Sequence, residues 1–203
     1  MFTIKSFISN NRTTKKNGLL ATFFPLFVLA ITSPFTFANA NANANANADE
    51  ANQEKAYEQL IPYYYAAART GDNEVISEFL NAGLPIDVKN HKGYTALMIA
   101  TYNGQKNIVN TLIKQGANVC AQDNRGNTAL MAAVFRGEFS IAKTLMSEDC
   151  DENQQNKAGQ TAVMYASLFG REELRELLVE RGADINLQDN SGNSATTIEQ
   201  LND

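Results

Sequence analysis

Apolar residues in the C-terminal two-thirds of the chain gather in pairs of short runs, and a glycine follows all but one of the runs. In residues 94–123 the first run, 96–100, is wholly apolar, and Gly104 comes shortly after it. The second run, 108–113, places its large aliphatic residues at the 3.6-residue spacing of an amphipathic helix, and Gly116 follows it. Glycine readily adopts the left-handed backbone that ends many helices. The pattern therefore predicts two short helices in this segment.

The same pair of runs returns every 33 residues. The period is clearest in one glycine column, made of Gly93, Gly126, Gly159 and Gly192. Two residues after each glycine stands a hydroxyl residue, in turn Thr95, Thr128, Thr161 and Ser194. A hydroxyl at this place can cap the first helix by accepting a hydrogen bond from an otherwise unpaired backbone N–H. Self-similarity at this period predicts a stacked-repeat solenoid, in which each unit buries its apolar face against its neighbours.

The repeat carries a motif that reads G-x-T-A-L-M-x-A, then a glycine, then a helix that ends L-x-x-x-G-A-x-x-N. Its clearest stretches are residues 159–164 and 182–186. This motif resembles the ankyrin repeat. The resemblance implies an all-α solenoid over residues 51–203, built of helix-turn-helix units joined by β-hairpin-like turns. The expected units are an N-terminal cap at 57–90, repeats at 91–123, 124–156 and 157–189, and a C-terminal cap at 190–203.

The chain departs from the ankyrin pattern at a few columns. Where the family has T-P-L-H, alanine replaces the proline, and Met98, Met131 and Met164 replace the histidines. We expect this methionine column to pack in the core rather than to bind a metal, because methionine fills irregular gaps between helices. At the end of the second helix in 124–156, Asp149 stands in the usual glycine position, so this corner is predicted to be reshaped or looser.

The resemblance places a binding surface on the turn tips and on the ends of the first helices. Carried over residue by residue, the candidate protein-binding side chains are Lys92, Tyr94, Tyr102, Arg125, Phe135, Arg136 and Phe169. Aromatic and arginine side chains dominate the energy of protein interfaces. The sequence leaves a second role open for Phe135, Leu168 and Phe169, which could instead pack between neighbouring helices.

Three consecutive tyrosines precede the first full repeat. Residues 49–60 read as a polar helix, Pro62 is expected to begin the next helix, and the tyrosines at 63–65 then fall in columns of a first helix. A terminal repeat must shield the exposed end of the core, and large amphipathic side chains suit that task. We interpret the tyrosines as a cap first and as a binding site second.

The N-terminal residues read as targeting sequence. Four basic residues and no acidic residue precede an apolar stretch, and small residues follow it, so we interpret 1–40 as a cleavable signal peptide. The alternative is an uncleaved membrane anchor. Residues 41–50 belong to an alternating Ala and Asn tract that suits a flexible linker. The mature protein is thus expected to be secreted across the inner membrane of a Gram-negative bacterium and to be periplasmic.

The charge and the cysteines narrow the choice of partners. The chain has a net charge of −5, and without its basic leader it keeps 13 basic and 22 acidic residues, so we expect neither a nucleic acid nor an anionic membrane as partner. Cys120 and Cys150 suit a disulfide in an oxidising compartment, which would contribute about 3.5 kcal/mol in the chain-entropy model. Two free, half-buried thiols are the alternative, and the sequence does not decide between them.

Residues for catalysis or for binding a metal are scarce. The chain has one histidine, His91, which is expected on an exposed turn, and no cofactor motif. The run Asp149, Asp151, Asn153 begins like a calcium loop, but Gln154 and Gln160 stand where such a loop needs glycine and glutamate. We therefore expect a non-enzymatic protein that binds an exported partner as stabiliser, inhibitor or immunity protein. The alternatives are an adaptor between two envelope proteins and, more remotely, a small hydrolase that depends on His91.

Overall fold

The computed structural model describes residues 59–202, with side chains up to residue 200. Within this range, residues 61–202 belong to one compact unit. The predicted signal peptide at 1–40 and the predicted linker at 41–50 lie outside the described residues.

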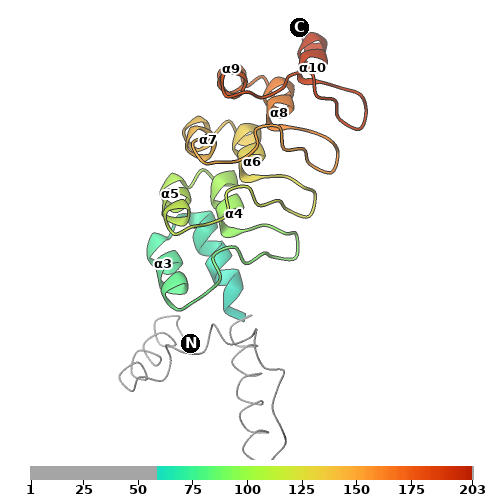
Figure 1. Cartoon of the computed structure of the whole chain (residues 1–203). Helices are drawn as coiled ribbons and strands as arrows, with labels where there is room; N and C mark the ends of the chain where they lie inside the picture. The colour runs from blue at the N-terminus through green and yellow to red at the C-terminus, as the bar shows by residue number, and fades with distance from the viewer. Residues whose placement is uncertain (1–58, 203) are drawn as a thin grey trace, which may run out of the picture. The chain divides into compact units, whose positions relative to one another are not determined.

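The described helices form two parallel layers (Figure 1). One layer holds the first helix of each unit and the other holds the second, and the long turns project beyond the first layer. In chain order the helices are residues 59–70, α3 (Asn73–Asn81), α4 (Ala96–Tyr102), α5 (Lys106–Lys114), α6 (Ala129–Arg136), α7 (Phe139–Met146), α8 (Ala162–Leu168), α9 (Glu172–Glu180) and α10 (Ala195–Asn202). Residues 59–202 contain no β-strand, so the predicted all-α solenoid is confirmed.

The first helices begin at the predicted hydroxyl caps. The Oγ1 atoms of Thr95, Thr128 and Thr161 accept hydrogen bonds from the backbone N–H three residues later, at 3.3, 3.2 and 3.4 Å. Each bond satisfies one of the donors that a helix start leaves unpaired. At the other end of a unit, Gly116 has φ +87°, so the predicted left-handed end of α5 is confirmed as well.

The core lies between the two layers. Every residue of α4 from Ala96 to Thr101 is buried, because alanine at its start and end lets the neighbouring helices approach closely. On α5 the buried side chains are Ile108, Val109 and Leu112, as the sequence spacing predicted. The three residues of the methionine column are buried too, and Met164 is only 1 % exposed.

A second polar column organises the turns. It consists of Asn90, Asp123, Asn156 and Asp189, again 33 residues apart. In each turn the Oδ1 atom accepts hydrogen bonds from the backbone N–H groups two and four residues later. Neighbouring turns are joined through their backbones, as where the N–H of Asn124 donates to the carbonyl of Lys92 at 3.0 Å. This column as a whole was not predicted from the sequence.

Gly126 shows why the turns also need glycine. Its φ is +82°, and a Cβ atom there would lie 2.8 Å from the backbone nitrogen of Lys157 in the next turn. Any side chain would therefore strain the backbone and separate the two turns.

The N-terminal cap differs from its prediction in one respect. The helix at 59–70 already includes the residues before Pro62, so Pro62 does not begin it. Proline keeps a helical φ and removes only one hydrogen-bond donor, so a helix can run through it at a cost. Tyr64 and Tyr65 are buried against the stack, and the hydroxyl of Tyr65 donates to the carbonyl of Val88 at 2.9 Å. Tyr63 points the other way and is 57 % exposed.

Successive units are clamped at the corner that follows the second helix. At the first junction both carboxylate oxygens of Asp87 accept from the backbone N–H of Asn118, at 3.0 and 3.1 Å. Two junctions later Asn153 occupies the same column, and its Oδ1 accepts from the N–H of Asp184 at 2.7 Å. Between them the column holds Cys120.

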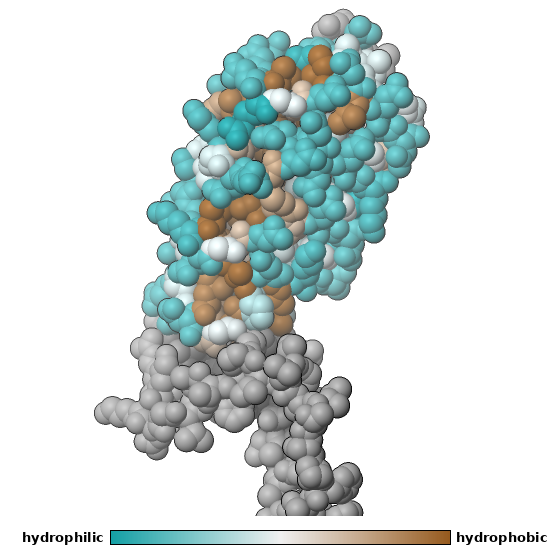
Figure 2. All heavy atoms as spheres, viewed as in Figure 1, coloured by the Kyte–Doolittle hydropathy of each residue, from teal (hydrophilic) through white to brown (hydrophobic). Residues whose placement is uncertain are grey.

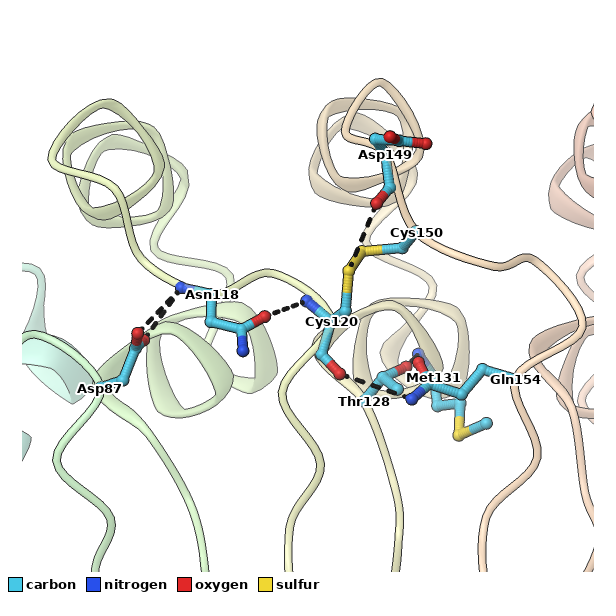
Figure 3. Close-up of a disulfide and its surroundings, with 8 residues drawn as sticks. All are labelled: Asp87, Asn118, Cys120, Thr128, Met131, Asp149, Cys150 and Gln154. Atoms are coloured by element: carbon cyan, nitrogen blue, oxygen red, sulfur yellow. Dashed lines mark hydrogen bonds between the residues drawn. A yellow bond between two sulfur atoms is a disulfide. The ribbon is translucent and has the colours of Figure 1, made fainter.

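The junction at Cys120 is closed by a covalent bond instead (Figure 3). Cys120 forms a disulfide with Cys150, and their Cα atoms are 5.6 Å apart, within the normal range for disulfides. The disulfide therefore stands where the other two junctions have a hydrogen bond between side chain and backbone.

The helix end beside this disulfide is reshaped, as Asp149 in the glycine column predicted. After α5 the N–H of Ala117 donates to the carbonyl of Leu112 at 3.0 Å. After α7 the equivalent N–H, that of Cys150, donates to the backbone carbonyl of Glu148 instead, also at 3.0 Å. The usual bond that closes the helix is thus missing at the place where the disulfide clamps the chain.

Candidate functional site

A groove of about 490 Å³ opens between the turns and the first helices α4 and α6. Its apolar base includes Met98 and Met131, which are almost fully buried. Aromatic residues form its walls, namely Tyr94, Tyr102, Phe135 and Tyr165. The groove draws on four units, from Arg69 in the N-terminal cap to Tyr165 in the third repeat, because the repeat places equivalent positions of adjacent first helices side by side.

An aromatic row runs along the ends of the first helices. The rings of Tyr102 and Phe135 stack with centroids 6.1 Å apart, and Phe169 meets Phe135 edge-on at 4.8 Å. Tyr102 is 47 % exposed and Phe169 is 37 % exposed, while Phe135 between them is half-buried. Leu168 is 45 % exposed next to Phe169. The row therefore both joins neighbouring helices and presents apolar surface to a partner.

Arginines flank the aromatic row. The guanidinium carbon of Arg136 lies 5.1 Å from the centroid of the Tyr102 ring, which is the distance of a cation–π contact. Arg69 and Arg125 line the groove itself and are exposed. Within residues 59–202 neither of these two forms an ion pair, in contrast to Arg175, which pairs with Glu199 at 2.6 Å.

Asp123 is the carboxylate in the groove lining, and the turn already uses it. Its Oδ1 accepts from the backbone N–H groups of Arg125 and Asn127, both at 2.8 Å, and its Oδ2 accepts from Nδ2 of Asn127 at 3.1 Å. Asp123 is also buried. Its charge is therefore held by the turn, and the groove presents arginine and aromatic groups to solvent.

Tyr165 connects the groove to a network of amides. Its hydroxyl lies 3.4 Å from Oδ1 of Asn127 and accepts from Nδ2 of Asn156 at 3.4 Å. Burial raises the pKa of Tyr165 above its ordinary value, the hydrogen bond from Asn156 opposes this rise, and the nearby Asp123 adds to it. The phenol is therefore neutral at physiological pH and can act as a hydrogen-bonding group in the groove wall.

The structure brings together six of the seven candidate binding residues. Tyr94, Tyr102, Arg125 and Phe135 line the groove, and Arg136 and Phe169 touch its aromatic wall. Lys92 lies apart from them on an exposed turn tip.

Sequence reasoning did not assign Tyr165 or Met131 to the groove. Met131 belongs to the methionine column, which was interpreted from the sequence as core packing alone. Tyr165 is a half-buried residue of α8, and only the stacking of adjacent units shows that it reaches the groove.

Basic residues gather on the turns, although they form no run in the sequence. Lys89, Lys92, Arg125 and Lys157 are all exposed along three neighbouring turns. Of these, Lys92 and Arg125 share one column of the repeat, so the 33-residue period places them on neighbouring turns. Figure 2 shows these projecting turns as hydrophilic, with apolar residues gathered over the helix pairs.

The positions considered for chemistry are in structural use or exposed. His91 lies on an exposed turn tip, and its carbonyl accepts from Nδ2 of Asn124 at 2.9 Å. Asp151 accepts from the N–H of Asn153 at 2.9 Å, and Asn153 serves the next junction. Among the described residues no group of three metal-ligating side chains is present. None of the helices described here is long and apolar enough to cross a membrane.

Comparison with known families agrees with this geometry. The family model of ankyrin repeats, in three copies, matches residues 36–123, 63–156 and 118–189. The chain belongs to the ankyrin-repeat family. Ankyrin repeats are general modules for protein–protein interaction and are typically non-enzymatic. No curated protein matches the chain.

Proposed function

We propose that this ankyrin-repeat protein is exported and binds another exported protein through the groove and the aromatic row beside it. The observation that carries the proposal is the exposed row of Tyr102, Phe135 and Phe169 with Arg136 over its first ring. Large aromatic and arginine side chains near the centre of a surface are the residues that contribute most to binding energy. In this account the partner covers the row and fills the groove.

The groove and the aromatic row are held in place and can serve as a preformed site. The turns are held by the Asn90, Asp123, Asn156 and Asp189 column, and the helices by the buried first layer. A preformed surface loses little conformational entropy on binding, so a larger share of the contact energy appears as affinity.

Two features of the chain support export. One is the basic and apolar leader at 1–40 followed by small residues. The other is the disulfide between Cys120 and Cys150, because such bonds persist in oxidising compartments. N-terminal sequencing of the protein from an envelope fraction should give a start between residues 38 and 48, whereas a chain that starts at Met1 would contradict export with cleavage.

The partner is an exported enzyme that the protein stabilises or a toxin that it neutralises. Binding of a partner at 100 times its dissociation constant stabilises the folded partner by about 2.7 kcal/mol, which is a large share of the stability of a marginal enzyme. Neither role needs catalytic residues in the ankyrin repeats.

The proposal is tested by affinity capture from an envelope fraction. The wild type is compared with a Tyr102→Ala, Phe135→Ala, Arg136→Ala variant and with a control that carries Lys106→Ala, Lys114→Ala and Val179→Ala on the second helices. Thermal unfolding checks that both variants are folded. A protein captured by the wild type and the control but lost by the first variant supports the proposal, and equal capture by all three contradicts it.

A further inference from the structure

We infer that the groove binds an extended segment of its protein partner in which a carboxylate side chain stands next to a large apolar side chain. This inference rests on the proposed function and specifies the chemistry of the partner at that site.

The base and walls of the groove select an apolar anchor. Met98 and Met131 form a floor that adapts its shape, because methionine has flexible, polarisable side chains. Tyr102 and Phe135 add aromatic walls on one side. The volume of about 490 Å³ lies in the range of sites that enclose a small ligand, so the groove holds a few side chains of a segment rather than a folded domain.

The charges of the groove select a carboxylate. Arg69 and Arg125 both line it, and neither has an ion pair within the described part of the chain. Away from the groove, Arg175 and Arg181 do have carboxylate partners, Glu199 at 2.6 Å and Glu152 at 3.3 Å. Asp123 does not neutralise the groove arginines, since its oxygens accept three hydrogen bonds from the turn. A guanidinium next to apolar surface is a strong site for a carboxylate, which it can bind through two parallel hydrogen bonds.

The distribution of charge over the unit points in the same direction. Four carboxylates follow the end of α7, namely Glu148, Asp149, Asp151 and Glu152. The exposed cations Lys89, Lys92 and Lys157 lie on the projecting turns, the part of each unit that also supplies Arg125 to the groove. An acidic partner is thus attracted to the turns and repelled from the segment after α7, which orients it during association.

A partner protein fits these features better than a nucleic acid does. The chain after its leader carries 13 basic and 22 acidic residues, so its overall field repels a polyanion. Two arginines above a methionine floor suit one carboxylate with an apolar neighbour rather than a row of phosphates.

The test is a selection of random dodecapeptides displayed on phage against the purified full-length protein. Enriched peptides are expected to carry Asp or Glu within three residues of an aromatic or large aliphatic residue. A synthetic peptide of the enriched sequence should bind at least tenfold more weakly to an Arg69→Glu, Arg125→Glu variant than to the wild type. The control variant Lys106→Glu, Lys114→Glu, which makes the same charge change on α5, should bind within twofold of the wild type. Because both arginines are exposed, the variant should stay folded, and circular dichroism checks this.

Each other outcome overturns the inference. Enriched peptides without acidic residues, equal binding to the arginine variant, or no enrichment at all would contradict a carboxylate site. Binding of a single-stranded oligonucleotide that is tighter than binding of the peptide and depends on the same arginines would also contradict it. If peptides without acidic residues bind a Tyr102→Ala, Phe135→Ala variant more weakly than the wild type, the groove remains the binding surface. Only the inferred carboxylate of the partner segment is then wrong. If neither variant changes peptide binding, both the inference and the proposed function fail at this face.

Discussion

Both the groove and the corners that join successive units are built from the 33-residue repeat, but they use it differently. At the corners, one column holds Asp87, Cys120 and Asn153, and all three join their unit to the next one. A carboxylate, a disulfide and an amide thus perform the same joining task there. In the groove, by contrast, Arg125 belongs to one turn only, and the turn before and the turn after have other residues in its column.

The contrast separates residues that hold the stack from residues that give it a partner. A structural column needs one interaction per junction and tolerates any chemistry that supplies it. A binding surface needs different side chains at successive repeats, because a partner is not itself periodic at 33 residues. We therefore expect changes at the corners to alter stability without altering affinity, and changes in the groove to do the reverse.

The largest expected effect comes from the covalent corner. A Cys120→Ser, Cys150→Ser variant should lose about 3.5 kcal/mol of the free energy of unfolding, measured by urea denaturation, because the denatured chain is no longer constrained. A Cys120→Asn, Cys150→Ala variant copies the amide that closes the corner at Asn153 and should lose about 1 kcal/mol less. Equal stability of the wild type and the serine variant would show that the disulfide does not clamp this junction.

The next effect belongs to the groove. Tyr102→Ala should weaken binding of the partner by about 2 kcal/mol, or roughly thirtyfold, because the ring is exposed and stacked under Arg136. Its effect on the free energy of unfolding should stay below about 1 kcal/mol, since the ring is nearly half exposed in the free protein. Isothermal titration and urea denaturation of the same preparation separate the two effects. A loss of stability with unchanged affinity would assign Tyr102 to packing alone.

A smaller effect is expected at the hydrogen-bonded corner. Asn153→Ala removes the acceptor for the N–H of Asp184 and should cost about 1 kcal/mol of the free energy of unfolding. Asn153→Asp is the matched control, because Asp87 performs the same task two junctions earlier, and it should keep most of the stability. The column has no such structural role if both variants denature at the same urea concentration as the wild type.

The smallest effect concerns the pH dependence of one turn. Hydrogen bonds from the backbone of Asn193, and then from its side chain and the N–H of Ser191, lower the pKa of Asp189 below its ordinary value. A lowered pKa in the folded state stabilises the fold above the unfolded pKa of about 4, and this contribution is lost as the pH falls through the lower folded pKa.

Replacing the carboxylate of Asp189 by an amide tests this contribution to the pH dependence of stability. Asp189→Asn should keep the turn, because Asn90 and Asn156 fill the same column, and should remove this part of the acid sensitivity. Thermal unfolding of both proteins between pH 2 and pH 6 checks it. The same decline of the melting temperature on acidification in both would exclude Asp189 as a source.

The repeating features of the fold could be predicted from sequence because they follow from local chemistry. Thr95 caps α4 and Gly116 ends α5 through contacts with residues a few positions away. The course of the chain at Pro62 could not be predicted in this way, since proline also permits a helix that continues through it. The tyrosines at 63–65 were assigned to the cap, but which of them faces solvent depends on packing against the next unit.

The candidate site was predictable only where the repeat aligned residues of a recognisable type. Tyr102 and Phe135 share a column, so their contact followed from the period. Lys92 was included because it lies on a turn tip, yet the side chains that line the groove sit nearer the first helices. Arg125 was included for the same reason, and the structure places it in the groove lining.

The most direct test of the account places a photo-crosslinking amino acid at Tyr102 or at Lys114 in the full-length protein and irradiates cells that export it. Lys114 ends α5 in the second layer and is exposed, so it serves as the matched position outside the groove. The account predicts one crosslinked exported protein from position 102 and none from position 114. Crosslinks from position 114 alone would contradict the claim that the groove and the aromatic row bind the partner.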